Sequence, residues 1–327
     1  MYDHRNIYEQ QAENKRMTFI IMLGFIVFLA FIGFGFDYYY FGAFEGDSFI
    51  PLGTIVAISV GTAMAISSLR NGAKSVLEST GAVPADPNNP AHKQLLNVVD
   101  EMAIASGIPM PQVFVVPDPD PNAFATGKDP QHSYVAVTQG LLDSLNREEL
   151  QGVIAHEMSH VRNYDIRLMT VVAAFVGAIV LLSDSARRGS RFGLLSGRGR
   201  SRSKGSLGLI ILVLWLIGIV LAPLIAQLMA MLVSRKREYL ADASGAELTR
   251  NPLGLASALR KLDSATAPTE SIKRGSAHLC IVDPLGRNIN SKEGFTAELF
   301  GTHPPIEKRI LALDAMAYQY KNAMPSV

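Results

Sequence analysis

The stretch His156-Glu157-Met158-Ser159-His160 carries two histidines four residues apart on either side of a glutamate. It lies in a segment that favours a helix, because Asn146 can cap the N-terminus and Glu149 can complete a capping box three residues later. Residues four apart share one face of a helix, so both imidazoles can reach one tetrahedral metal ion. Glu157 can contact a water molecule on that metal without being a ligand. The stretch therefore predicts a catalytic zinc site with Glu157 as general base.

The alternative for this stretch is a solvated polar helix face, which the spacing would then match by accident. The chain has only 7 histidines, so such an accident is improbable. The predicted helix also supplies the structural context that the motif requires. We therefore interpret the stretch as a metal site.

A catalytic zinc ion needs a third protein ligand and an open fourth position. The other candidate histidines are His92, His132, His278 and His303. A stronger candidate is the carboxylate pair Glu238 and Asp242, spaced so that one can bind the metal while the other accepts the N–H of a ligating histidine. Spacing alone leaves open a surface acidic pair beside the basic residues 235–237.

The composition indicates a membrane protein. Hydrophobic residues make up 48% of the 327 residues and charged ones 18%, whereas soluble domains carry roughly 25% charged residues. A net charge of +1 favours neither nucleic acid nor an acidic substrate as a partner. The single cysteine, Cys280, excludes internal disulfides and a cysteine-based zinc site.

Two uncharged stretches, Met17–Phe36 and Ile50–Leu69, are each about as long as a bilayer requires. The first predicts a retained anchor rather than a signal peptide, because the aromatic run after Asp37 offers no cleavage site. Basic residues precede the first stretch and follow the second. The connector between the two stretches, which includes Asp37, is acidic. The positive-inside rule therefore places the N-terminus and the region after Arg70 in the cytoplasm.

Two further apolar stretches, Leu168–Ser183 and Leu207–Val233, enclose the segment Arg187–Lys204, which has seven basic residues and no acidic one. If Glu238 binds the same metal as His156 and His160, this region crosses the membrane twice or not at all. The length of the last stretch favours crossing and a four-helix bundle. The positive-inside rule favours a shallow hairpin that does not cross. No aromatic platform accompanies the basic residues, so we expect no nucleic-acid partner.

The remaining sequence predicts an α+β, mainly helical catalytic domain. Apolar residues from Leu95 to Ile104 recur at helical spacing before Gly107, and Val113–Val116 and Ser133–Thr138 look like strands. The predicted organisation is a cytoplasmic segment 1–16, two transmembrane helices 17–69 with an outward connector, a first catalytic part 70–165, a hydrophobic helical hairpin 166–233 and a second catalytic part 234–327.

The extended motif His156-Glu157-x-x-His160-x-x-Asn163-x-Asp165, followed by Glu238-x-x-x-Asp242, resembles the HtpX-type membrane metallopeptidases, relatives of the CAAX prenyl endopeptidases. Three further segments resemble the family in the same order: Asn122–Gly127, Ser133–Gly140, and Thr302-His303-Pro304-Pro305-x-x-x-Arg309-Ile310. The resemblance implies a zincin-like (gluzincin-type) fold fused to a transmembrane bundle, one Zn²⁺ per chain, and Glu238 as third ligand. The Arg187–Lys204 segment is more basic than the family pattern, which leaves the topology open.

The same resemblance implies an endopeptidase of the bacterial inner membrane that acts from the cytoplasmic side on damaged or misassembled membrane proteins. Its partners would be membrane-protein or peptide substrates and the lipid bilayer. A CAAX-type or other processing peptidase is the alternative enzyme. A non-enzymatic membrane chaperone or scaffold is the alternative of another class, but intact Glu157 and histidines favour catalysis. A transporter is disfavoured, because the apolar stretches lack buried ionisable residues.

Three other residues are candidates with open alternatives. His303 could stabilise an oxyanion or act as an occasional fourth ligand, or it could be a structural histidine set by the prolines that follow it. Asn122 could line a groove where a peptide adds to a strand edge, or could belong to a simple turn. Arg309 could pair with an acid such as Asp242, or could be an exposed helix residue.

Overall fold

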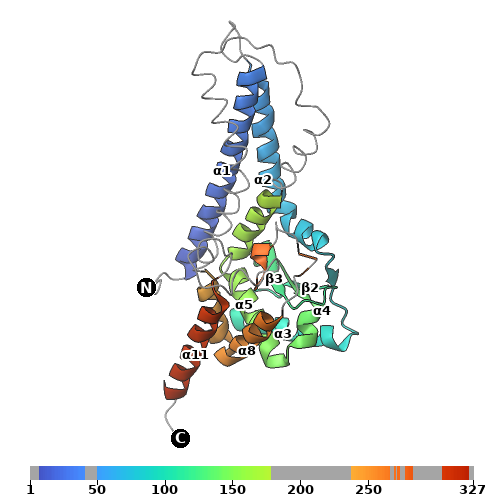
Figure 1. Ribbon diagram of the computed structural model, residues 1–327, viewed down its shortest axis with the longest axis vertical. Coiled ribbons are helices and arrows are strands. Elements are labelled where there is room, and N and C mark those ends of the chain that lie inside the picture. The colour runs from blue at the N-terminus through green and yellow to red at the C-terminus, as the bar shows by residue number, and fades with distance from the viewer. Residues whose placement is uncertain are drawn as a thin grey trace.

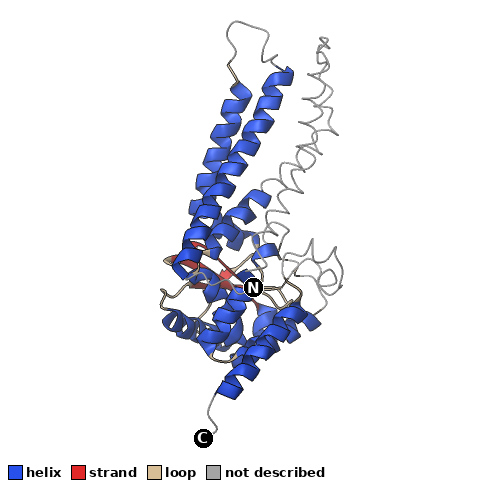
Figure 2. Cartoon of the chain, turned by 90° about the vertical axis from the view of Figure 1, so that its left-hand side faces the viewer, coloured by secondary structure: helices blue, strands red, loops and turns tan. Residues whose placement is uncertain are grey.

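The computed structural model describes residues 7–40, 50–177, 237–265, 269, 271–272, 277–282 and 304–323. Within them the chain is mainly helical, with one small sheet. A long two-helix hairpin projects from a part that contains the sheet and the shorter helices (Figures 1 and 2). The basic segment Arg187–Lys204, the apolar stretch Leu207–Val233 and His303 lie outside the described residues.

The hairpin consists of α1 (Ile7–Tyr40) and α2 (Leu52–Ser79). Both are long and apolar enough to cross a bilayer, and only 28% and 17% of their apolar windows are buried. A core helix of a soluble protein would be mostly buried, so these faces suit lipid instead. Each helix extends beyond the apolar stretch that marks it, because α1 begins before Met17 and α2 continues past Leu69.

Asp37 joins the two helices near the far end of the hairpin. Its carboxylate accepts hydrogen bonds from the backbone N–H groups of Gly53 and Thr54, both at 2.7 Å. The N-cap residue of α2, Pro51, makes no side-chain cap, so Asp37 supplies the acceptor that the first turn needs. The sequence suggested that Asp37 belongs to the connector, but it is a buried residue of α1 that fixes the alignment of α1 against α2.

The sheet has the strand order β1-β2-β4-β3. The strands are β1 (Val83–Pro84), β2 (Gln112–Val116), β3 (Ala123–Asp129) and β4 (His132–Thr138). Strand β2 runs parallel to β4, whereas β1 and β3 are antiparallel to their neighbours. The predicted strands Val113–Val116 and Ser133–Thr138 are confirmed. The sequence did not predict β3, which is an edge strand and which begins directly after Asn122, the residue for which a simple turn was considered.

The named helices of this part are α3 (Pro90–Ser106), α4 (Gln139–Ser144), α5 (Arg147–Arg162), α8 (Pro252–Ser264), the 3₁₀ turn η1 (Ala277–Leu279) and α11 (Ile306–Ala323). Residues 165–177 and 237–249 are also helical. Helix α5 begins with the predicted capping box, in which Asn146 and Glu149 exchange hydrogen bonds of 3.0 and 2.8 Å. Glu149 also pairs with Lys261 of α8 at 2.6 Å.

Both faces of the sheet are buried, and they meet different helices. Val113 and Val135 point into a core formed with α3, α5 and α8. Val116 and Phe124 point into a second core, formed with α1, α2 and residues 165–177. This follows from the alternation of side chains along a strand. The sheet therefore lies between the helices that carry the motif and the long hairpin, and apolar packing joins the two.

Candidate metal centre

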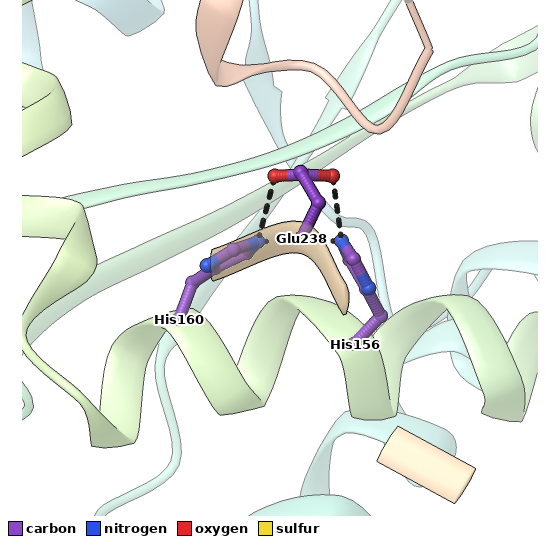
Figure 3. Close-up of side chains that lie close together, drawn as sticks. All are labelled: His156, His160 and Glu238. Carbon is purple, nitrogen blue, oxygen red and sulfur yellow. Dashed lines mark hydrogen bonds and ion pairs between the residues drawn. The ribbon is translucent and has the colours of Figure 1, made fainter. Parts of the chain in front are cut away.

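Helix α5 presents His156 and His160 on one face, with their Nε2 atoms 3.3 Å apart (Figure 3). The helical stretch 237–249 places Glu238 opposite them. One oxygen of Glu238 lies 3.6 Å from Nε2 of His156, and the other lies 3.4 Å from Nε2 of His160. All three side chains are buried. Local spacing on α5 thus supplies two ligands, and a segment about 80 residues away supplies the third.

These distances fit a zinc ion. Ligand atoms about 2.1 Å from a tetrahedral ion are separated from one another by about 3.4 Å. The other ring nitrogens also fit, since Nδ1 of His156 lies 2.9 Å from Asp242 and Nδ1 of His160 lies 3.0 Å from Asp165. Each Nδ1–H therefore donates to a carboxylate, which turns both Nε2 lone pairs toward Glu238. Lone pairs that converge on a carboxylate require a cation between them.

The charges of the centre also call for a cation. Four buried carboxylates surround the histidines: Glu157, Asp165, Glu238 and Asp242. Among the described residues, the guanidinium groups that pair with them are those of Arg237 and Arg309, so the formal charge is −2 with neutral histidines and ionised acids. Burial lowers the pKa of His156 and outweighs its contact with Asp242, which keeps this ring neutral. A divalent ion would balance the centre.

The pKa of His160 shifts in the opposite direction. Burial would lower its pKa, but hydrogen bonds to Asp165 and Glu238 outweigh burial and raise the pKa well above the usual value. In the absence of a metal, a proton on His160 therefore takes the place that the cation would fill. Burial acts on both histidines, but His160 hydrogen-bonds to two carboxylates, those of Asp165 and Glu238, which raise its pKa. His156 hydrogen-bonds to Asp242 alone, and the nearby Arg309 guanidinium also lowers its pKa.

Arg309 of α11 is 1% exposed and binds the acidic side of the centre. Its Nε and Nη2 donate to the two oxygens of Asp242, at 2.8 and 2.7 Å, and its Nη1 donates to the Ile281 carbonyl at 2.9 Å. Nη1 also lies 3.3 Å from Glu238. The predicted pair with Asp242 is confirmed, and the exposed-arginine alternative is wrong. A bidentate guanidinium fixes the plane of the carboxylate that orients His156.

Glu157 lies beside the two histidines and is 1% exposed. Its Oε2 has no hydrogen-bond partner among the described residues, while the backbone of Ala125 on β3 bonds to the carboxyl group. Burial, together with the neighbouring Glu238, raises the pKa of Glu157 to about 7, against the opposing influence of His160 and Arg309. This carboxyl group can therefore both accept and release a proton near neutral pH.

Two glycines let the helices around the centre approach at backbone distance. A Cβ on Gly245, in the stretch 237–249, would lie 3.0 Å from the backbone nitrogen of His156. A Cβ on Gly152, in α5, would lie 2.7 Å from the backbone nitrogen of Leu255 in α8. A side chain at either position would have to push backbone aside. Backbone contact thus sets the separation of α5 from the ligand-bearing stretch 237–249 at Gly245, and of α5 from α8 at Gly152.

Asn122 is fully buried and does not point to open space. Its Nδ2 donates to the Val282 carbonyl at 3.0 Å. Residues 280–282 lie along the edge of β3, where Phe124 and Cys280 form a bridge and the Ile281 N–H donates to Ala123 at 2.9 Å. Asn122 therefore holds a segment of the chain itself beside β3, and its role toward substrate stays a prediction. The predicted roles of His303 are not tested, since His303 lies outside the described residues.

The sequence did not indicate what orients His160. Asp165 does so, and it follows the turn at Asn163 and Tyr164 that ends α5. Tyr164 has a φ of 61°, which reverses the chain direction enough to bring Asp165 back against the imidazole. Asp165 lies five residues after His160, and this spacing is the signal that could have identified it. Residues five apart are not neighbours on a helix face, so helical periodicity does not point to this pair.

Comparison with known proteins agrees with this site. Residues 90–317 match the family model described as Peptidase family M48. The chain is similar to the Protease HtpX homolog of Caldanaerobacter subterraneus, with 43% identity over 95% of this chain and 98% of that protein. For the Protease HtpX homolog of Thermoanaerobacter pseudethanolicus, identity is 44% over 95% of this chain and 98% of that protein.

Among solved structures, the crystal structure of S. mikatae Ste24p has a similar fold, with a TM-score of 0.50 and 19% identity. That similarity covers 94% of this chain and 66% of the Ste24p chain. The predicted zincin-like fold is therefore confirmed. Together with the buried site of two histidines and one glutamate, these matches show that the chain belongs to Peptidase family M48, as a membrane metalloprotease of the HtpX type.

Proposed function

We propose that this metalloprotease is a zinc-dependent endopeptidase that cleaves damaged or misassembled membrane proteins from the cytoplasmic face of the bacterial inner membrane. The observation that carries the chemistry is the buried Glu157 carboxyl group beside three convergent metal ligands, with one oxygen that has no hydrogen-bond partner in the described part of the chain. The observation that supports the substrate class is the apolar packing of the hairpin against the sheet of the catalytic part. This packing holds the site close to the membrane.

In the proposed mechanism, His156, His160 and Glu238 hold the zinc ion through the two Nε2 atoms and the carboxylate. When bound, zinc polarises a peptide carbonyl and makes water nucleophilic at neutral pH. Glu157 accepts the proton of the attacking water at Oε2 and then delivers it to the leaving peptide nitrogen. A pKa of about 7 suits both steps, since the group is present in both protonation states at neutral pH.

The other residues of the centre position the metal ligands and the substrate. Asp242 holds the ring of His156, and Arg309 holds Asp242 and Glu238 in turn. Asn122 shapes the substrate groove indirectly, by fixing Val282 beside β3. His303 stays a candidate for stabilising the oxyanion, on the basis of its place in the sequence motif alone.

The substrate class can be tested with a folded membrane protein and a destabilised variant of it in proteoliposomes. With zinc supplied, we expect the destabilised variant to be cleaved faster and at several sites, because an extended segment must enter the site. Cleavage of both forms at one position and at one rate would favour a processing peptidase. If the destabilised variant were bound but not cleaved, the result would favour a chaperone and overturn the proposal.

The orientation can be tested with an exposed cysteine in the catalytic part. Gln131 is exposed in the turn between β3 and β4, whereas Cys280 is buried, so the unmodified chain gives the background. We expect Gln131→Cys to react with an impermeant thiol reagent only after the cells are permeabilised. Reaction in intact cells would place the catalytic part outside. A cysteine at Ser196 reports separately whether the region 166–233 crosses the membrane.

A further inference from the structure

We propose that the membrane helix α1 is part of the metal centre, because Asn14 acts as a positioning residue for His160 through Asp165. This inference rests on the proposed zinc function. Asn14 precedes the apolar stretch of α1 and belongs to none of the motifs described above. The N-terminal end of α1 reaches the part of the chain that holds the sheet and α5 (Figure 1).

The side chain of Asn14 is 5% exposed and makes two hydrogen bonds to residues that follow α5. Its Nδ2 donates to Oδ1 of Asp165 at 2.6 Å and to the carbonyl of Asn163 at 2.8 Å. An amide nitrogen carries two hydrogens, and both partners are acceptors. The amide group must therefore turn its NH₂ toward Asp165, and both hydrogens are used.

Asp165 transmits this contact to the metal ligand. Its other oxygen, Oδ2, lies 3.0 Å from Nδ1 of His160. Arg237 approaches Oδ1 as well, at 3.4 Å, but it is part-buried and less close than Asn14. Asn14 thus fixes the plane of a carboxylate whose second oxygen fixes the imidazole. Partners of this kind orient ligating histidines and raise their affinity for metal.

The remainder of α1 is anchored on the same region. Phe25 stacks on Phe175 with ring centroids 4.0 Å apart, and Gln11 donates to the Arg162 carbonyl at 2.8 Å. Helix α1 is continuous from Ile7 to Tyr40, so Asn14 stands about 4.5 Å along the axis before Met17, where the apolar stretch begins. The membrane anchor and the support of His160 are therefore one rigid element, and the zinc site lies close to the membrane boundary.

The test compares zinc affinities of full-length variants by competition with a chelator. Asn14→Leu keeps the size of the side chain but removes the donor. We expect it to weaken zinc binding by about fivefold to tenfold, somewhat less than the roughly 10–100-fold typical of a direct partner of a ligand, here Asp165→Asn. Gln11→Leu is the matched control, since Gln11 lies one turn away on α1 and contacts α5 but not Asp165. It should leave zinc affinity unchanged.

A double variant separates positioning from simple docking of α1. In the Asp165→Asn background, Asn14→Leu should cause no further loss of zinc affinity, because the link to His160 is already broken. The proposal would be overturned if Asn14→Leu and Gln11→Leu lost zinc affinity equally. It would also be overturned if the two losses of zinc affinity were fully additive in the double variant. If Asn14→Leu does not fold, Asn14→Asp retains the shape and opposes Asp165 with a like charge, and zinc affinity unchanged in Asn14→Asp would also overturn it.

The readout distinguishes this inference from the proposed function. Affinity ratios between variant and parent are independent of turnover, so a parent chain that binds zinc but cleaves no protein would refute the proposed function alone. A parent chain that binds no zinc would refute both. Thermal unfolding of the zinc-free proteins gives a second check, because a purely structural role predicts similar loss of stability for Asn14→Leu and Gln11→Leu with zinc affinity intact.

Discussion

Glu157→Gln is expected to retain zinc and to lose peptide cleavage by about 10²–10⁴-fold, the usual contribution of a positioned general base. The substitution keeps the size of the side chain and does not touch the three ligands, so the metal centre should assemble. The amide cannot accept the proton of the attacking water, and the other described carboxylates of the centre are already engaged. Glu238 and Asp242 are both held by Arg309, and Asp165 is held by Asn14.

The measurement pairs metal content with the rate of cleavage of a destabilised membrane protein. Glu149→Gln is the matched control, since Glu149 is a buried glutamate on the same helix that serves the capping box and Lys261 rather than the metal. It should cleave at nearly the parent rate. Near-normal turnover of zinc-loaded Glu157→Gln would show that another group accepts the proton, and the mechanism would have to be abandoned.

Glu238→Ala is expected to abolish tight zinc binding, whereas Asp242→Asn should weaken it by only about 10–100-fold. Glu238 supplies a ligand atom, and two histidines alone leave the site short of the three protein ligands that a catalytic zinc ion requires. Asp242 acts on Nδ1 of His156 and keeps its ring turned. The asparagine is chosen because it keeps the volume of the side chain and one oxygen that can accept a hydrogen bond from Arg309. It still removes the charge that pairs with the buried guanidinium, a change that typically costs about 3–5 kcal/mol.

Zinc titration with thermal unfolding of the zinc-free protein checks both variants. We expect Glu238→Ala to lose zinc affinity without losing stability of the zinc-free protein. Removing Glu238 deletes one negative charge from an acidic cluster, which offsets the lost contacts. Asp242→Asn should lower both. If Asp242→Asn loses zinc outright while Glu238→Ala keeps it, the two residues have exchanged roles, and the ligand set must be redrawn.

The parts of the structure that the sequence predicted are those with local signals. The start of α5 follows from Asn146 and Glu149, and the facing histidines follow from helical periodicity. Strand β3 escaped prediction because Ala123–Asp129 contains a glycine, a lysine and an aspartate and lacks a run of β-branched residues. Hydropathy located the apolar part of α1 but not its beginning, because the polar residues before Met17 are good helix formers and continue the helix.

The contacts that orient the ligands have no local pattern in the sequence. Asn14 and Asp165 are 151 residues apart, and their contact was not predicted. Arg309 and Asp242 are 67 residues apart, and their pair was only one of two alternatives that the sequence left open. Each pair forms only because the sheet and both apolar cores bring separate helices together. Glu238 was predicted because spacing suggested it and a family resemblance selected it. Its distances to His156 and His160 agree with that prediction.

The close approach of helices at Gly245 and Gly152 has a consequence for protein engineering. Replacing helical glycines by alanine is a common route to greater thermostability, because alanine restricts the unfolded chain. At these two positions the added methyl group would meet backbone atoms at 3.0 and 2.7 Å, and backbone cannot move aside as a side chain can. A stabilisation screen guided by helix propensity alone would therefore select substitutions that push α5 away from the stretch 237–249 at Gly245, or from α8 at Gly152, and should exempt both glycines.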